Sequence, residues 1–245
     1  MHTSKNSHLT GNIGLETTKI FLKFCYFSIL VCFLSCKSEP TNKGTSTNSN
    51  TTTQVEKTKQ ESKKRIVVFG DSLTAGYGLD DVNDAFPGVI QKTIDSLGLD
   101  YEVVNSGVSG ETTAGGKNRI DWILSEEPSI FILELGGNDG LRGVPLKETH
   151  ANLQTIIDRV KTKYPECKIV LAGMQIPPNL GQDYTTEFKN IFPELAKKNN
   201  LTLIPFLLED VGGIKTLNQP DGIHPTKAGH KIVAQNVWSV LQPLL

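Results

Sequence analysis

The fold is decided by the stretch Ile66-Val67-Val68-Phe69-Gly70-Asp71-Ser72-Leu73. Its first four residues are apolar, and Gly70 ends the run, so the stretch predicts a buried strand followed by a turn. Similar short apolar runs recur at residues 101–105, 130–135, 168–174 and 201–206. Because strands that are apolar throughout need cover on both faces, the five runs predict a parallel sheet.

Longer stretches with helical spacing of apolar residues lie between these strands. Residues 84–97, 149–163 and 226–241 each gather their large apolar side chains on one side. Strands that alternate with amphipathic helices predict an α/β domain over residues 65–245. In an open parallel sheet the ligand crevice lies beyond the carboxyl ends of the strands, so functional residues are expected there.

Composition and charge exclude several classes of protein. The 245 residues are 38% hydrophobic and 21% charged, a globular balance that excludes collagen, a coiled coil and a wholly disordered chain. The net charge of −1 leaves no excess of Lys and Arg for a nucleic-acid partner. Of the four cysteines only Cys167 lies in the domain, so a disulfide-stapled scaffold is not expected.

The N-terminal segment has the pattern of an export signal. Lysines precede an uncharged run over residues 24–36, whose 13 residues are fewer than the roughly 20 needed to span a bilayer. We therefore predict a lipoprotein-type signal peptide over residues 1–35. The run ends in Phe33-Leu34-Ser35-Cys36, which resembles a bacterial lipobox and implies a lipid on Cys36. An uncleaved membrane anchor is the alternative, and either interpretation holds the domain in the bacterial cell envelope, facing the periplasm or the cell surface.

Residues 36–64 begin with that cysteine and continue as a polar segment. Ser, Thr and Asn occupy 14 of the 28 positions from 37 to 64, so the segment buries too little apolar surface to order itself. We predict a disordered tether. Cleavage before Cys36 removes three cations and one anion, which leaves 22 positive and 25 negative side chains and a net charge of −3. Attachment to anionic lipid by charge alone is therefore disfavoured.

Glycines and polar residues cluster where three of the strands end. Residues 70–73 follow the first strand, residues 105–112 close the second, and residues 136–140 follow the third. Glycines there let the backbone turn sharply and approach a substrate. Ser72 opens a helix at the first of these ends, where its hydroxyl can face the crevice as a nucleophile. A helix N-cap is the plainer alternative for this serine.

A nucleophilic serine needs a general base, and histidine serves near neutral pH. The domain offers His150 at a helix start, His230 in an exposed helix between lysines, and His224 in Asp221-Gly222-Ile223-His224-Pro225. The first two have structural explanations, so we predict His224 as the base, with Asp221 fixing its tautomer. A metal site there would lack a third and a fourth ligand, so no metal is expected.

An acyl-transfer transition state also needs hydrogen-bond donors aimed at the developing oxyanion. The N–H groups of Ser72 and Gly110 and the side-chain amide of Asn138 come from three neighbouring strand ends, and we predict that they form this site. Each taken alone has a plainer structural explanation, as a turn residue or a loop-stabilising side chain. The prediction rests on the position of all three at neighbouring strand ends.

Four blocks resemble, in order, those of the SGNH (GDSL) hydrolases: Gly70-Asp71-Ser72-Leu73, Gly110, Gly137-Asn138-Asp139 and Asp221-Gly222-Ile223-His224-Pro225. Longer phrases at residues 103–105, 109–112 and 134–143 are similar to a narrower branch of that family. This branch contains the bacterial periplasmic multifunctional acyl-CoA thioesterases, arylesterases and lysophospholipases. The resemblance covers residues 65–245 and implies a flavodoxin-like three-layer αβα sandwich with a five-stranded parallel sheet.

The resemblance implies a role for each matching residue. Ser72 becomes the nucleophile, His224 the general base and then acid, and Asp221 its orienter. The oxyanion hole falls to the N–H groups of Ser72 and Gly110 and to the side chain of Asn138. No metal or organic cofactor is implied, the substrate is a small acyl ester or thioester, and we expect a monomer. A substrate-contacting loop of the branch matches residues 140–145, with candidate contacts Leu141, Arg142, Val144 and Pro145.

The predicted function is therefore a serine esterase of the arylesterase, lysophospholipase or thioesterase type, acting through an acyl-Ser72 intermediate. A carbohydrate acetyl esterase is one alternative, since other branches of the family deacetylate polysaccharides. A surface-tethered binding lipoprotein without turnover is another alternative.

Two charged residues, Glu134 and Arg142, each allow two interpretations. Glu134 either braces the Asn138 loop or is an ordinary core acid, and Arg142 either meets a polar head group or is a solvated cation.

Overall fold

The computed structural model describes residues 63–245. The predicted signal peptide over residues 1–35, the lipidation of Cys36 and nearly all of the tether over residues 36–64 lie outside the described residues. The domain begins with strand β1 at Lys64, one residue before the predicted boundary. Within the described range no helix is long and apolar enough to cross a membrane.

Five parallel strands of residues 63–245 form one sheet, in the order β2-β1-β3-β4-β5. They are β1 Lys64–Gly70, β2 Tyr101–Gly107, β3 Ile130–Glu134, β4 Lys168–Ala172 and β5 Thr202–Ile204. In the register of the sheet, Val68 of β1 lies between Asn105 of β2 and Ile132 of β3. The predicted five-stranded parallel sheet is confirmed, and its strand order is that of the flavodoxin-like class.

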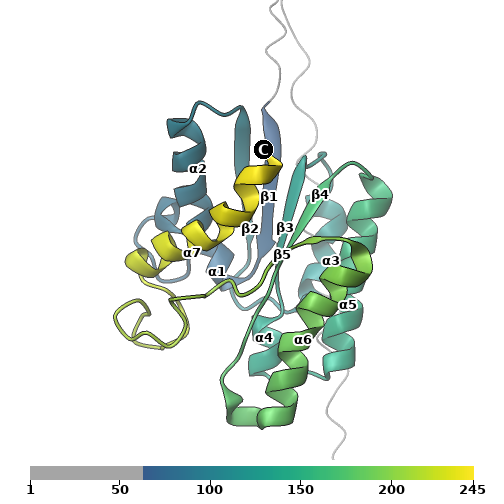
Figure 1. Cartoon of the computed structure of the whole chain (residues 1–245), viewed down its shortest axis with the longest axis vertical. Helices are drawn as coiled ribbons and strands as arrows, with labels where there is room; N and C mark the ends of the chain where they lie inside the picture. The colour runs from purple at the N-terminus through teal and green to yellow at the C-terminus, as the bar shows by residue number, and fades with distance from the viewer. Residues whose placement is uncertain (1–62) are drawn as a thin grey trace, which may run out of the picture. The chain divides into compact units, whose positions relative to one another are not determined.

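Helices cover both faces of this sheet (Figure 1). On one face α2 Phe86–Ser96 packs against α7 Lys227–Leu241, and on the other lie α3 Thr113–Ile123, α5 Leu146–Lys163 and α6 Gln182–Asn199. Two short helices, α1 Ser72–Ala75 and α4 Gly137–Leu141, follow β1 and β3. Short 3-10 helices lie at η1 Val82–Asp84, η2 Pro178–Leu180 and η3 Gln242–Leu244. The predicted three-layer αβα sandwich is confirmed.

The hydrophobic core fills both interfaces between the sheet and its helices. Every residue of β3 is buried, as are residues 66–70 of β1. Helix α5 contributes four fully buried aliphatic side chains at helical spacing, Leu153, Ile156, Ile157 and Val160. The central strands are therefore apolar throughout because both of their faces are covered.

Several elements differ from the predicted ones, among them two strands and two long helices. Strands β4 and β5 end at Ala172 and Ile204, two residues before their predicted ends. Just past these ends the two segments are still linked, because the Gly173 N–H donates to the Ile204 carbonyl at 2.8 Å and the Leu207 N–H donates to the Gly173 carbonyl at 2.9 Å. Helices α3 and α6 are not predicted, because adjacent glycines near the start of α3 and Pro193 inside α6 weaken their helical patterns.

The strand order fixes where the crevice opens. From β1 the chain crosses to β2 on one side and then to β3 on the other, so the switch point lies at the carboxyl ends of β1 and β3. Helices α1 and α4 begin at these two ends and carry Ser72 and Asn138. The topology thus brings two of the predicted site residues to neighbouring strand ends.

Candidate active site

Ser72 lies where β1 passes into α1. The carboxylate of Asp71 caps this helix by accepting from the Leu73 N–H at 3.0 Å. The N-cap role considered as the alternative for Ser72 is therefore filled by Asp71, and Ser72 is the first residue of the helix. Its N–H has no acceptor within the helix, as is general for first-turn N–H groups. Ser72 is 8% exposed and lines a cavity at the switch point.

His224 connects Ser72 with Asp221. Its Nε2 lies 2.9 Å from Ser72 Oγ, and its Nδ1 lies 2.7 Å from Asp221 Oδ2. The other oxygen of Asp221 accepts from the N–H groups of Ile223 at 2.9 Å and His224 at 3.0 Å. The hydrogen bond from His224 lowers the pKa of Asp221 to about 2, so this carboxylate is charged at neutral pH. The structure thus brings the predicted nucleophile, base and orienter into one hydrogen-bonded chain, the Ser72–His224–Asp221 relay.

The loop before α7 holds His224 in this position. An isolated antiparallel bridge pairs Asn218 with Pro225, and the Gln219 N–H donates to the His224 carbonyl at 2.7 Å. The Gln219 side chain donates to the Tyr77 carbonyl at 2.7 Å. The Tyr77 ring lies 4.6 Å from the His224 ring, measured between centroids. The loop is thereby fastened to the segment that follows α1.

The other residues predicted for the oxyanion hole lie after β2 and β3. Asn138 in α4 lines the same cavity as Ser72, and its Nδ2 donates to Asp71 Oδ2 at 3.0 Å. Gly110 has a φ of +78°, and its carbonyl accepts from Arg142 Nη2 at 3.1 Å. The N–H of Gly110 has no hydrogen-bond partner among residues 63–245. Gly110 itself is not among the residues that line the cavity.

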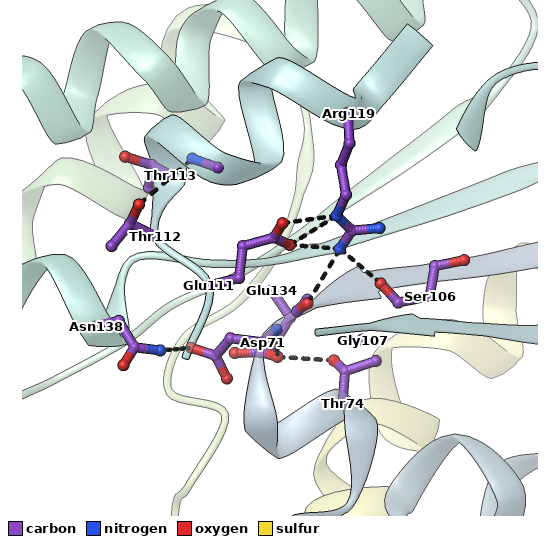
Figure 2. A network of polar contacts seen from close by, with 12 residues as sticks. Asp71, Thr74, Ser106, Gly107, Glu111, Thr112, Thr113, Arg119, Glu134 and Asn138 are labelled. Carbon is purple, nitrogen blue, oxygen red and sulfur yellow. Dashed lines mark hydrogen bonds and ion pairs between the residues drawn. The ribbon is translucent and has the colours of Figure 1, made fainter. Parts of the chain in front are cut away.

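Two buried carboxyl groups support this arrangement (Figure 2). Glu134, at the end of β3, is fully buried, and its Oε2 accepts from the Asp71 N–H at 3.1 Å and from the Thr74 hydroxyl at 2.7 Å. Burial raises the pKa of Glu134 well above its usual range and raises the pKa of Asp71 to about 6. Glu134 therefore braces the turn that carries Ser72, and it is linked to Asn138 only through Asp71.

An apolar cavity of about 310 Å³ opens beside the relay. Met174 and Ile176, which follow β4, line it together with Phe206 and Leu208, which follow β5. None of these four residues is singled out from the sequence. The rule that ligands bind beyond the carboxyl ends of the strands would have pointed to them, because both segments leave the sheet at that edge.

The four residues predicted as substrate contacts have different surroundings. Leu141 lines the cavity and is 36% exposed. The Val144 carbonyl instead accepts from the Tyr184 hydroxyl at 2.8 Å, and Pro145 is the N-cap residue of α5. The guanidinium of Arg142 reaches the loop after β2, as described above. Of the four, only Leu141 borders the space beside the relay.

The other histidines of the domain lie outside the relay. His230 is predicted to be exposed, and this is wrong: it is 1% exposed, because its side of α7 faces the start of α2. Its Nδ1 accepts from the Phe86 N–H at 3.2 Å. Burial lowers the pKa of His230 to about 4, so the ring is neutral at pH 7. His150 lies within α5 and does not line the cavity.

Metal-ligating and thiol side chains do not gather in the described part of the chain. Residues 63–245 contain no group of three or more His, Cys, Asp or Glu that could hold a metal ion. Cys167, the single cysteine of that range, is a free thiol whose pKa is raised to about 12 by burial. Such a thiol is a poor nucleophile at neutral pH.

An α/β sandwich that holds serine, histidine and aspartate in one relay has the architecture of a serine hydrolase. The chain belongs to the GDSL-like lipase/acylhydrolase family, whose model matches residues 68–232. It is 39% identical over 189 residues to esterase TesA of Pseudomonas aeruginosa, covering 77% of this chain and 92% of that protein. Thioesterase 1/protease 1/lysophospholipase L1 of Escherichia coli K12 is 35% identical over 181 residues, covering 74% and 84%.

A solved structure agrees with this membership. A crystal structure of TesA matches with a TM-score of 0.71 at 39% identity, over 74% of this chain and all of that one. The resemblance carried by the four sequence blocks is therefore confirmed at the level of family and fold.

His230 makes the stability of the domain depend on pH. Its pKa is about 4 in the folded protein and near 6.5 when unperturbed, so the unfolded chain binds the extra proton as pH falls between these values. The folded protein therefore loses stability as pH falls through that window, by about 3–4 kcal/mol in all, since one pKa unit is about 1.4 kcal/mol.

His230→Asn keeps an acceptor for the Phe86 N–H but does not titrate. In urea titrations at pH 7 and pH 4.5, we expect the variant to lose less stability than the wild type on acidification. Comparison with the wild type cancels the contribution of the carboxyl groups, which both proteins share. An equal loss in the two proteins would contradict the assignment of this titration to His230.

Proposed function

We propose that this chain is a serine esterase that cleaves acyl esters and thioesters through an acyl-Ser72 intermediate. One observation carries the proposal: the relay from Ser72 through His224 to Asp221, with contacts of 2.9 Å and 2.7 Å, lies beside an apolar cavity. A base at this distance can take the hydroxyl proton. Membership of a lipase/acylhydrolase family and the relatives named esterase and thioesterase support the same activity.

Acylation begins when His224 Nε2 takes the Ser72 proton while Ser72 Oγ attacks the acyl carbon. Nε2 can accept only if Nδ1 carries the ring proton, and the 2.7 Å contact with Asp221 favours that tautomer. The imidazolium then gives its proton to the leaving alcohol or thiol. In the second half, His224 takes a proton from water, the oxygen of that water attacks the acyl-Ser72 ester, and Ser72 recovers its proton as the carboxylic acid departs.

The developing oxyanion is proposed to bind three donors. Asn138 Nδ2 carries two hydrogens; one is donated to Asp71, which orients the amide, and the second is left for the substrate. The Ser72 N–H points out of the first turn of α1, without an acceptor in the helix. The Gly110 N–H, without a partner among the described residues, is the third donor. Stabilisation by such donors is usually the largest single contribution to catalysis.

The cavity favours a fatty acyl chain over a sugar. Met174, Ile176, Phe206 and Leu208 give the cavity a mainly apolar lining, against which an acyl chain would bury apolar surface. Beyond the proposed catalytic groups and Asp71, the polar side chains of the lining are Gln175 and Asn218, which are few for a sugar with several hydroxyl groups. This observation disfavours the carbohydrate acetyl esterase. Both hydrogen-bonded contacts of the relay are present, which likewise disfavours a binding protein without turnover. Leu141 would contact the acyl chain from the loop after α4.

Substitution of the relay tests the proposed activity. Ser72→Ala and His224→Asn remove groups that the first step needs, so kcat on p-nitrophenyl esters is expected to fall by at least about 10³-fold. Asp221→Asn keeps the base but loses control of its tautomer, and a loss of about 10²–10⁴-fold is expected. His150→Asn is the matched histidine control outside the cavity, and its kcat should stay within about twofold. Wild-type activity in Ser72→Ala would overturn the proposal.

For the N-terminal region we propose the roles that its sequence predicts. Residues 1–35 direct export, Cys36 carries the lipid, and residues 36–64 tether a monomeric domain to a membrane of the bacterial envelope. An esterase anchored there would meet lysophospholipids and other envelope esters ahead of cytoplasmic acyl-CoA. The relative that carries lysophospholipase in its name is consistent with that substrate class.

Mass spectrometry of the full-length protein purified from membranes tests this location. We expect a mature chain that begins at Cys36 with a diacylglyceryl modification, and we expect Cys36→Ser to abolish it. A mature chain that retains residues 1–35, or one that lacks lipid on Cys36, would contradict the proposed anchor.

A further inference from the structure

Arg119 makes a set of contacts that the proposed mechanism does not use (Figure 2). It lies within α3, and its side chain runs back to the loop between β2 and α3. Its Nε donates to both carboxylate oxygens of Glu111, at 2.7 Å and 2.9 Å, and its Nη2 donates to one of them. The guanidinium also lies over the Phe69 ring, 4.1 Å from its centroid.

This ion pair is largely withdrawn from solvent. The side chain of Glu111 is 6% exposed, and that of Arg119 is 20% exposed. Removing two charges from water offsets much of their attraction, so a buried pair is weak evidence for stability. A planar guanidinium does supply fixed geometry, because its N–H groups hold several partners in set directions.

The same guanidinium joins the ends of β1 and β2. Its Nη2 donates to the Ser106 carbonyl at 2.8 Å and to the Gly70 carbonyl at 3.4 Å. The Gly70 carbonyl also accepts from the Val108 N–H at 3.0 Å. Two strand ends and the loop that follows β2 therefore meet at one side chain.

These contacts flank both backbone donors of the proposed oxyanion hole. Gly70 lies two residues before Ser72, and Glu111 directly follows Gly110. The side chain of Arg119 is therefore hydrogen-bonded to the chain next to each donor. Movement of this side chain would change the separation of the two N–H groups.

We propose that Arg119 and Glu111 are positioning residues that set the distance between the N–H groups of Ser72 and Gly110. The inference rests on the proposed function, because it requires those groups to receive an oxyanion. A misplacement of about 1 Å can cost about 10²-fold in rate. Neither residue lines the apolar cavity, so the effect falls on kcat and leaves substrate binding nearly unchanged.

Two conservative variants test the inference. Arg119→Lys keeps the charge but loses the planar fork, and Glu111→Gln keeps the size of the side chain but loses its charge. We expect kcat per folded enzyme on a p-nitrophenyl ester to fall by about 10–100-fold in each, with KM within about threefold. Asp121→Asn is the control, because it breaks an exposed ion pair of the same helix with Arg159 at 3.1 Å. Its kcat should be unchanged.

Inhibition constants supply a readout that a merely structural role would not move. An alkyl boronic acid forms a tetrahedral adduct on the serine oxygen and so reports on the oxyanion hole without turnover. We expect its inhibition constant to rise by about 10–100-fold in both variants, in step with the loss of kcat. The inhibition constant of the matching fatty acid should stay within about threefold, since it depends mainly on the cavity.

Wild-type kcat and wild-type boronic acid affinity in both variants would overturn the inference, as would an equal change in Asp121→Asn. A fall in affinity for both inhibitors alike would also overturn it, because it would indicate a general loss of structure. If Arg119→Lys does not fold, Glu111→Gln decides by the same readouts. These outcomes are separate from failure of the proposed function, which would appear as hydrolysis by Ser72→Ala.

Discussion

The hydrogen bond between His224 Nε2 and Ser72 Oγ joins residues that lie 152 positions apart in the chain. The strand order brings Ser72 to the switch point beside β3, and the packing of α7 against α2 brings the C-terminal loop back toward α1. Gln219 then ties that loop to the Tyr77 carbonyl. A contact of 2.9 Å across such a separation depends on the whole sheet and its covering helices, so the proposed chemistry and the fold cannot be separated.

Buried polar groups hold the residues around that contact. Glu134 accepts hydrogen bonds from the Asp71 N–H and the Thr74 hydroxyl, which flank Ser72. The Asp71 carboxylate in turn accepts a hydrogen bond from the Asn138 side chain. The second carboxyl oxygen of Glu134 has no partner among residues 63–245. Its raised pKa agrees with this, because a neutral carboxyl group costs less to bury than a carboxylate. The pair of Glu111 and Arg119 joins the ends of β1 and β2.

Short-range patterns were enough to predict the sheet and the relay, because each apolar run and each motif block is contiguous in the sequence. Long-range contacts decide what could not be predicted. The lysines near His230 indicated exposure, but its burial depends on Phe86, which lies 144 residues away. Strands β4 and β5 end at Ala172 and Ile204, and the segments that follow them, with Met174 and Phe206, line the cavity. Neither the burial of His230 nor the lining of the cavity can be predicted from residues that are close together in the sequence.

The covalent step is tested most directly by mass spectrometry after treatment with a fluorophosphonate, which reacts with activated serines. Trypsin releases Ser72 in the peptide of residues 66–92, where it is the only serine. We expect one adduct per chain, on Ser72, with ester hydrolysis lost in proportion to labelling and with labelling slowed in His224→Asn. An adduct on a different residue, or hydrolysis that persists after complete labelling of Ser72, would contradict the proposed acyl-Ser72 mechanism.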